Sequence, residues 1–105
     1  MANINKIIIE LNSELKLLYP NYKGVYLFGS RLKNDTAEGS DLDLVFVFEG
    51  GVNSKLEEAI WEIVYNYDLK YDIVIDAKVY ELKDIKYPAA PFRKTVRNKG
   101  RYYAV

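Results

Sequence analysis

Residues 27–48 read LFGSRLKNDTAEGSDLDLVFVF, two apolar runs joined by a polar connection. The first run breaks at Gly29-Ser30 and predicts a buried strand that leaves into a turn. The second run predicts a strand with alternate residues on opposite faces. Asp41 and Asp43 lie two positions apart at its start, so their carboxylates should leave the same face and can share one or two hard cations.

The flanking sequence predicts helices and further strands. Apolar residues recur at helical spacing over residues 3–18, and Pro20 follows where such a helix would stop. Asn53 or Ser54 can cap a second helix, whose apolar positions reach Tyr67. A short helix is expected from Phe92, ending at Gly100. The strands expected around these helices span residues 25–28, 42–48, 72–79 and, as a last edge strand, 102–105.

This order of elements predicts an α/β (α+β) fold, a small mixed sheet with helices packed on one face and the other face left partly open. The first two strands should pair antiparallel, and the connection through a helix should make the second and third parallel, with a right-handed crossover. The Gly-Ser turn, Asp41, Asp43 and Asp72 would then meet at one edge of the open face. Asp72 is preferred to Asp76 as the third carboxylate because it begins its strand, and four residues of strand separate the two by about 13 Å.

Composition narrows the chemistry of such a site. The 105 residues, 50% of them hydrophobic, suit one compact domain over residues 1–105. Fifteen basic and fifteen acidic residues balance, so neither bulk nucleic-acid binding nor a membrane surface is expected. The chain has no cysteine and no histidine, which disfavours zinc, and paired carboxylates favour Mg²⁺ or Mn²⁺. The absence of a long apolar run at the N-terminus predicts a cytoplasmic protein.

The Gly-Ser turn is a candidate phosphate-binding site. Gly29 lets the backbone approach a phosphate closely, and Ser30 offers a hydroxyl where a helical turn can present free amides. Arg31 and Lys33 add positive charge just beyond. Each feature alone also fits an ordinary turn or a solvated strand end, so the functional interpretation depends on their combination.

That combination, Gly29-Ser30-Arg31 followed by Ser40-Asp41-Leu42-Asp43-Leu44, resembles the signature of the polymerase-beta-like nucleotidyltransferases. It is most similar to the minimal nucleotidyltransferases, and the likeness covers nearly the whole chain. The resemblance implies the nucleotidyltransferase fold, with the nucleotide held by Gly29, Ser30, Arg31, Lys33 and Ser40. It implies that the catalytic carboxylates, which bind Mg²⁺ or Mn²⁺, are Asp41, Asp43 and Asp72.

The chain departs from the pattern Gly-Ser-x-Ala-Arg-Gly that many relatives share, because it has Leu32, Lys33 and Asn34 at the last three positions. Lys33 keeps the positive charge. Asn34 replaces glycine with a residue that tolerates left-handed backbone.

Minimal nucleotidyltransferases are often antitoxin partners of HEPN-domain ribonuclease toxins, and some transfer AMP from ATP to a tyrosine of the toxin. The resemblance therefore implies ATP as the nucleoside triphosphate and a hydroxyl acceptor on a partner protein. Too little sequence follows the core strands for an acceptor-binding domain, which disfavours modification of a small molecule. The alternative is a non-catalytic antitoxin or binding module that acts by occlusion. Retention of both Asp41 and Asp43 favours the enzyme.

Aromatic and basic residues outside the motif have simpler expected roles. Four tyrosines should pack in the core or at its rim, and they are Tyr65, Tyr67, Tyr71 and Tyr80. Trp61 should lie half-buried on the flank of the second helix, with a partner surface as the alternative. The basic residues of the tail should face water, and they are Arg93, Lys94, Arg97 and Lys99.

Overall fold

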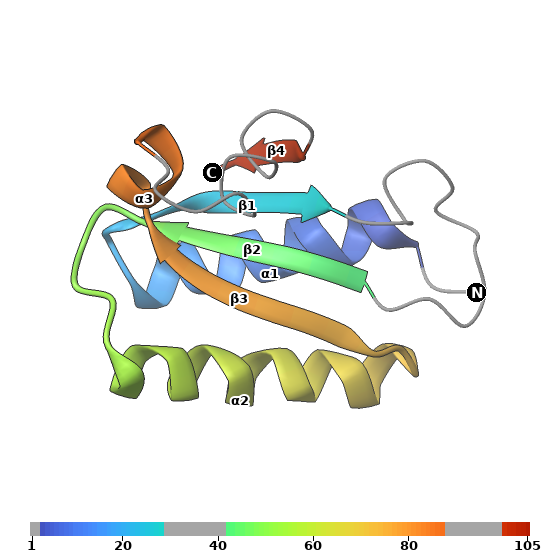
Figure 1. Ribbon diagram of the computed structural model, residues 1–105. Coiled ribbons are helices and arrows are strands. Elements are labelled where there is room, and N and C mark those ends of the chain that lie inside the picture. Colours follow the sequence, from blue (N-terminus) through green and yellow to red (C-terminus); the bar gives the residue numbers. More distant parts are fainter. Residues whose placement is uncertain (1–2, 29–41, 88–99) are drawn as a thin grey trace.

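The computed structural model describes residues 3–28, 42–87 and 100–105. The four strands of these ranges form one mixed sheet in the order β3-β2-β1-β4 (Figure 1). Along the chain the elements are α1 (Ile4–Leu18), β1 (Tyr22–Phe28), β2 (Leu42–Phe48), α2 (Ser54–Tyr71), β3 (Ile75–Glu81), α3 (Leu82–Lys86) and β4 (Arg101–Ala104).

Helix α1 forms where its apolar spacing predicts. The side chain of Asn3 caps the helix by accepting a hydrogen bond from the Lys6 backbone N–H at 3.2 Å. The apolar stripe of the helix faces the sheet and is buried. The helix ends at Leu18, two residues before Pro20, as expected.

Helix α2 begins as expected but runs one turn further. The Asn53 side chain accepts a hydrogen bond from the Leu56 N–H at 2.9 Å, which caps the first turn. At the other end, Tyr71 and Lys70 both donate hydrogen bonds to the Glu10 carboxylate on α1. These contacts with α1 stabilise the last turn of α2, residues 68–71. The apolar periodicity of α2 does not reveal them.

The predicted strand pairing is confirmed. β1 pairs antiparallel with β2, and β2 pairs parallel with β3 across the helical connection. β4 is an edge strand, antiparallel to β1. The short helix expected near Phe92 lies outside the described residues.

The two faces of the sheet are covered unequally. α1 and α2 pack on one face and bury the apolar side of β2, which consists of Leu42, Leu44, Phe46 and Phe48. On the other face Val45 and Val47 pack against Ile85 of α3, a helix that the sequence patterns did not predict. Five residues are too few for a recognisable helical period. This second face is thus partly open, as expected.

The aromatic residues of α2 mostly pack as predicted. Tyr67 is buried, and its hydroxyl donates to Glu14 of α1 at 2.8 Å. Trp61 is 47% exposed, and its indole N–H donates to the Ala77 carbonyl of β3 at 3.0 Å. Tyr65 is exposed, so the core or rim position expected for it is wrong.

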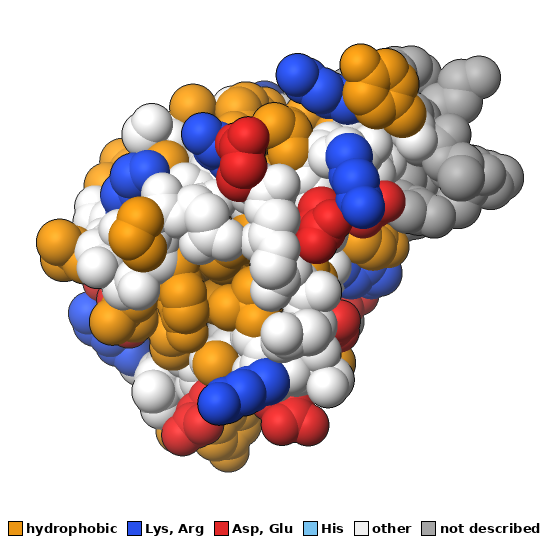
Figure 2. All heavy atoms as spheres, turned by 90° about the vertical axis from the view of Figure 1, so that its left-hand side faces the viewer, with side chains coloured by type: hydrophobic (Ala, Val, Ile, Leu, Met, Phe, Trp, Pro, Cys, Tyr) orange, Lys and Arg blue, Asp and Glu red, His pale blue; other side chains and the backbone are white. Residues whose placement is uncertain are grey.

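The surface carries charges of both signs. Figure 2, which shows the end of the molecule where β2 and β3 finish, has basic, acidic and hydrophobic side chains interspersed. Within the described part of the chain, no helix combines the length and apolar character needed to cross a membrane.

A buried polar contact joins α1, β1 and β4. The Tyr22 hydroxyl donates to the Asn12 side-chain oxygen, and the Asn12 amide donates to the Tyr103 carbonyl at 3.2 Å. Burial raises the pKa of the Tyr22 phenol, so the hydroxyl stays protonated and remains a donor. The Tyr22 and Asn12 side chains therefore link all three elements.

Replacing Tyr22 with phenylalanine should destabilise the protein by about 1 to 3 kcal/mol, because the Asn12 oxygen stays buried without its donor. Urea unfolding followed by circular dichroism measures this change. Tyr65→Phe is the matched control, since Tyr65 is 58% exposed, and it should shift the free energy of unfolding by less than about 0.5 kcal/mol. Equal stability of the two variants would show that Asn12 finds another donor.

Candidate active site

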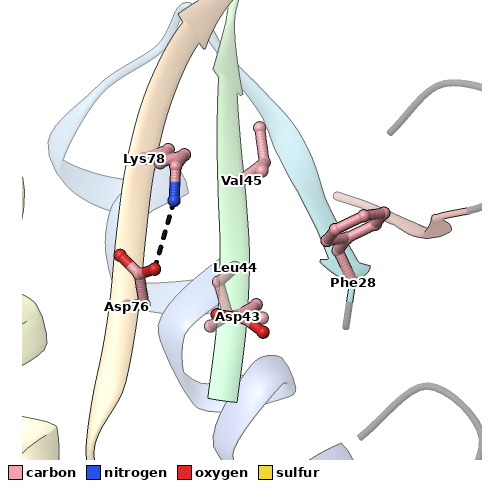
Figure 3. Close-up of a pocket in the computed structure, with 6 residues that line it drawn as sticks. All are labelled: Phe28, Asp43, Leu44, Val45, Asp76 and Lys78. Carbon is pink, nitrogen blue, oxygen red and sulfur yellow. Dashed lines mark hydrogen bonds and ion pairs between the residues drawn. The ribbon is translucent and has the colours of Figure 1, made fainter. Parts of the chain in front are cut away.

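A cavity of about 240 Å³ opens on the sheet face opposite α1 and α2 (Figure 3). Three neighbouring strands, β1, β2 and β3, provide its lining. The described residues that line it are Phe28, Asp43, Leu44, Val45, Asp76 and Lys78. It therefore combines two carboxylates and one ammonium with an apolar wall.

Strand register brings the two carboxylates together. Asp43 of β2 lies directly opposite Asp76 of β3 in the parallel pair. On the other side of β2, Phe28 at the end of β1 lies opposite Asp43. Adjacent strands are about 4.8 Å apart, so the two aspartates are close enough to bind one cation.

The expected position of Asp72 beside the carboxylate pair is wrong. Asp72 follows the last turn of α2 and adopts left-handed backbone, with φ of 51° and ψ of 55°. β3 begins only at Ile75, whose N–H donates to the Asp68 side chain at 3.1 Å. Because α2 is a turn longer than its period indicated, the strand starts later, and Asp76 takes the register position that Asp72 was expected to occupy.

The charges in the cavity are partly paired. The Lys78 ammonium lies 3.1 Å from one Asp76 oxygen, and the two side chains are 40% and 47% exposed. Figure 3 shows them pointing toward each other along β3, with Asp43 on the neighbouring strand. Lys78 therefore offsets part of the negative charge that the two carboxylates bring to the cavity.

Six of the residues predicted for the site lie outside the described residues, and they are Gly29, Ser30, Arg31, Lys33, Ser40 and Asp41. The chain nonetheless leaves the described region at Phe28 and re-enters it at Leu42, two strand ends at this edge of the sheet. Asp41 directly precedes Leu42 in the chain.

The donors of the cavity suit a hard cation. Carboxylate oxygens are the ligands that Mg²⁺ and Mn²⁺ prefer, and Asp43 and Asp76 supply them from adjacent strands. The described residues contain no cluster of three or more acidic, histidine or cysteine side chains arranged for a metal. A cation held here by the two aspartates would need further ligands from elsewhere, such as a substrate phosphate.

Four residues that line the cavity were not predicted for the site, and Asp76 was ranked below Asp72; the four are Phe28, Leu44, Val45 and Lys78. Phe28 was seen as the end of a buried strand, although its position just before Gly29 places it at the candidate site. The signal for Asp76 and Lys78 was their parity, because residues two apart on a strand share a face.

The chain is similar to known proteins over most of its length. The nucleotidyltransferase domain family matches residues 8–103. The "Putative protein adenylyltransferase" of Methanocaldococcus jannaschii is 36% identical over 98 residues, which span 89% of this chain and 95% of the relative.

Solved structures show a similar fold. Chains in two crystal structures of mutant MntA-HpeT toxin-antitoxin complexes superpose with TM-scores of 0.59 and 0.60, at 22% and 20% identity. The superpositions cover 98% and 96% of this chain and 72% of each matched chain. Because the family match extends over most of its length, the chain belongs to the nucleotidyltransferase family and is an enzyme of that class.

Proposed function

We propose that this enzyme transfers AMP from ATP to a hydroxyl group of a partner protein, and that Asp41, Asp43 and Asp76 are its catalytic carboxylates. The observation that carries the proposal is the pairing of Asp43 with Asp76 across β2 and β3, at the wall of an open cavity. The 36% identical relative, which carries the name "Putative protein adenylyltransferase", supports the choice of reaction and acceptor.

The three carboxylates are proposed to hold Mg²⁺ or Mn²⁺. Nucleotidyltransferase domains generally use divalent metals, and such a cation would neutralise phosphate charge and favour in-line displacement of pyrophosphate. Asp43 and Asp76 offer carboxylate oxygens at paired strand positions. Asp41 lies two positions before Asp43 in the sequence and directly precedes β2. The residue proposed as the third carboxylate is therefore Asp76 and no longer Asp72.

The chain's own residues would bind and orient the reactants. The acceptor hydroxyl attacks the α-phosphate, the bond to the pyrophosphate breaks, and the hydroxyl proton passes to a carboxylate or to water. Phe28 and Val45 form an apolar wall beside the carboxylates, which limits water there. Gly29 and Ser30, which follow Phe28 directly, remain the proposed triphosphate ligands, with Arg31, Lys33 and Ser40 nearby in sequence.

The proposed acceptor is a hydroxyl of a toxin of the HEPN type. This choice follows from the resemblance to minimal nucleotidyltransferases, and the likeness to chains in toxin-antitoxin structures is in keeping with it. The acceptor hydroxyl would then belong to another molecule, the partner toxin.

Labelled ATP tests the proposal. The protein is incubated with a HEPN-type toxin, MgCl₂ and ATP that carries ³²P at either the α or the γ position. Label should enter the toxin from α-labelled ATP alone, because transfer of AMP leaves the γ-phosphate in pyrophosphate. Asp43→Asn should lower the rate by about 100-fold or more, since it removes a carboxylate that holds the cation.

Other outcomes point to other functions. Label from γ-labelled ATP would indicate phosphorylation instead of nucleotidyl transfer. A tight complex with the toxin that carries no label from either ATP would overturn the proposal in favour of occlusion. A thermal unfolding curve for Asp43→Asn that matches wild type excludes loss of fold as the cause of its lower rate.

A further inference from the structure

Lys78 is the one basic side chain among the described residues that line the cavity. It is two positions from Asp76 on β3, so both side chains leave the same face of the sheet. Across the strand pair Lys78 lies opposite Val45. Its aliphatic stem can therefore rest on an apolar neighbour while its ammonium reaches Asp76, at 3.1 Å (Figure 3).

The ion pair engages Oδ2 of Asp76, one of the two oxygens that this carboxylate could offer the proposed metal. Asp76 cannot give the same lone pairs to both an ammonium and a divalent cation. In the free protein Lys78 offsets the repulsion between Asp43 and Asp76. Any cation bound by Asp76 must then compete with a charge that the chain itself supplies.

The pair is weak enough to exchange. Both side chains are close to half exposed, at 40% and 47%. Ion pairs in such positions change an equilibrium constant by no more than about fivefold. A divalent cation with several oxygen ligands can therefore displace Lys78 at small cost.

We infer, on the basis of the proposed function, that Lys78 is a positioning residue with two alternative partners. It pairs with Asp76 in the free protein. When Asp76 ligates a divalent cation, the Lys78 ammonium turns to a phosphate oxygen of the nucleotide. Its three N–H donors and its place on the same cavity wall suit it to an anion that enters beside the carboxylates.

Another lysine of the same region provides a matched control. Lys83 of α3 forms an ion pair with Glu81 at 3.3 Å, close in length to the pair of Lys78 with Asp76. Lys83 is not among the residues that line the cavity. A change that follows from loss of any surface charge should appear in Lys83→Met, whereas a change specific to the cavity should not.

The first measurement is the affinity of the full chain for Mn²⁺ in the absence of nucleotide. Electron paramagnetic resonance monitors the bound and free Mn²⁺. Lys78→Met should bind Mn²⁺ about two- to fivefold more tightly than wild type, because the competing ammonium is gone. Lys78→Arg and Lys83→Met should stay close to wild type. Thermal unfolding of each variant checks that the fold is kept.

The second measurement is the affinity for a non-hydrolysable ATP analogue at saturating Mg²⁺, by calorimetry. Lys78→Met should weaken it by about tenfold or more, as loss of a charged hydrogen bond to phosphate predicts. Lys78→Arg should restore most of the affinity. Opposite effects of one substitution on metal and nucleotide are not expected from a lysine that only stabilises the fold.

Two results would overturn the inference, and they differ in what they imply for the proposed function. If Lys78→Met matches Lys83→Met in both measurements, Lys78 is an ordinary surface charge, and the metal site stands as long as Asp43→Asn loses Mn²⁺. If Asp43→Asn binds Mn²⁺ as tightly as wild type, the metal site itself is wrong, and the role of Lys78 fails with it.

Discussion

Asp76→Asn should lower nucleotidyl transfer by about 100-fold or more, whereas Asp72→Asn should leave it within about twofold of wild type. The substitutions are chemically identical, and the residues are four positions apart. Asp76 lies opposite Asp43 and lines the cavity. Asp72 follows α2 in left-handed backbone, which asparagine adopts as readily as aspartate does. Only the first substitution removes an oxygen ligand from the proposed cation.

The measurement is the initial rate of toxin labelling from α-labelled ATP, at saturating Mg²⁺ and again at tenfold lower Mg²⁺. Asp76→Asn should lose more activity at the lower concentration, because a weakened cation site is then less occupied. Urea unfolding of both variants serves as the control for folding. Loss of transfer in Asp72→Asn alone would restore the register first expected from the sequence and remove Asp76 from the site.

The sheet was predictable because its signals are local. Leu42, Leu44 and Phe46 alternate with residues of the other face, and the apolar period of α1 leaves one choice for its buried side. Strand directions followed from the lengths of the connections. The pairing of β1 with β2 and of β2 with β3 therefore required no knowledge of tertiary contacts.

The third carboxylate was not predictable, because it depends on where a helix stops. The last turn of α2 is held by contacts of Tyr71 and Lys70 with Glu10, a residue about sixty positions away in the chain. Such contacts do not appear in the periodicity of either helix. An error of one helical turn moves the start of β3 from Asp72 to Ile75, and the residue opposite Asp43 changes with it.

The link between Lys78 and the cavity was missed for a related reason. The sequence shows that Lys78 and Asp76 lie two positions apart and so share one face of their strand. It does not show which residues of the neighbouring strand lie beside them. Only the register of β3 against β2 places that face beside Asp43. α3 was missed because five residues carry too little periodicity to distinguish a helix from a turn.

Gly24→Ala should destabilise the protein by about 2 to 4 kcal/mol, because the added methyl group meets both a strained backbone and a close neighbour. Gly24 has φ of 143°, a conformation that other residues rarely adopt. A Cβ atom there would lie 2.4 Å from the Tyr103 carbonyl oxygen of β4 and 2.9 Å from the Tyr102 hydroxyl. The backbone of β4 cannot move aside without losing its pairing with β1. The backbone strain at Gly24 and the collision with β4 therefore both lower the stability of the variant.

The effect should be confined to stability because of where β4 lies. In the sheet order β3-β2-β1-β4, a Cβ on Gly24 would meet β4 on one side of β1, whereas Asp43 and Asp76 pair across β2 and β3 on its other side. Transfer by folded Gly24→Ala at low temperature should thus stay near wild type, while hydrogen exchange at residues 101–104 speeds up. Gly50→Ala is the control, since a Cβ there meets no atom within 4 Å, and it should change the free energy of unfolding by less than about 0.5 kcal/mol. Equal urea midpoints for the two variants would mean that β1 relaxes at Gly24, and a parallel loss of transfer would mean that β4 supports the site as well as the fold.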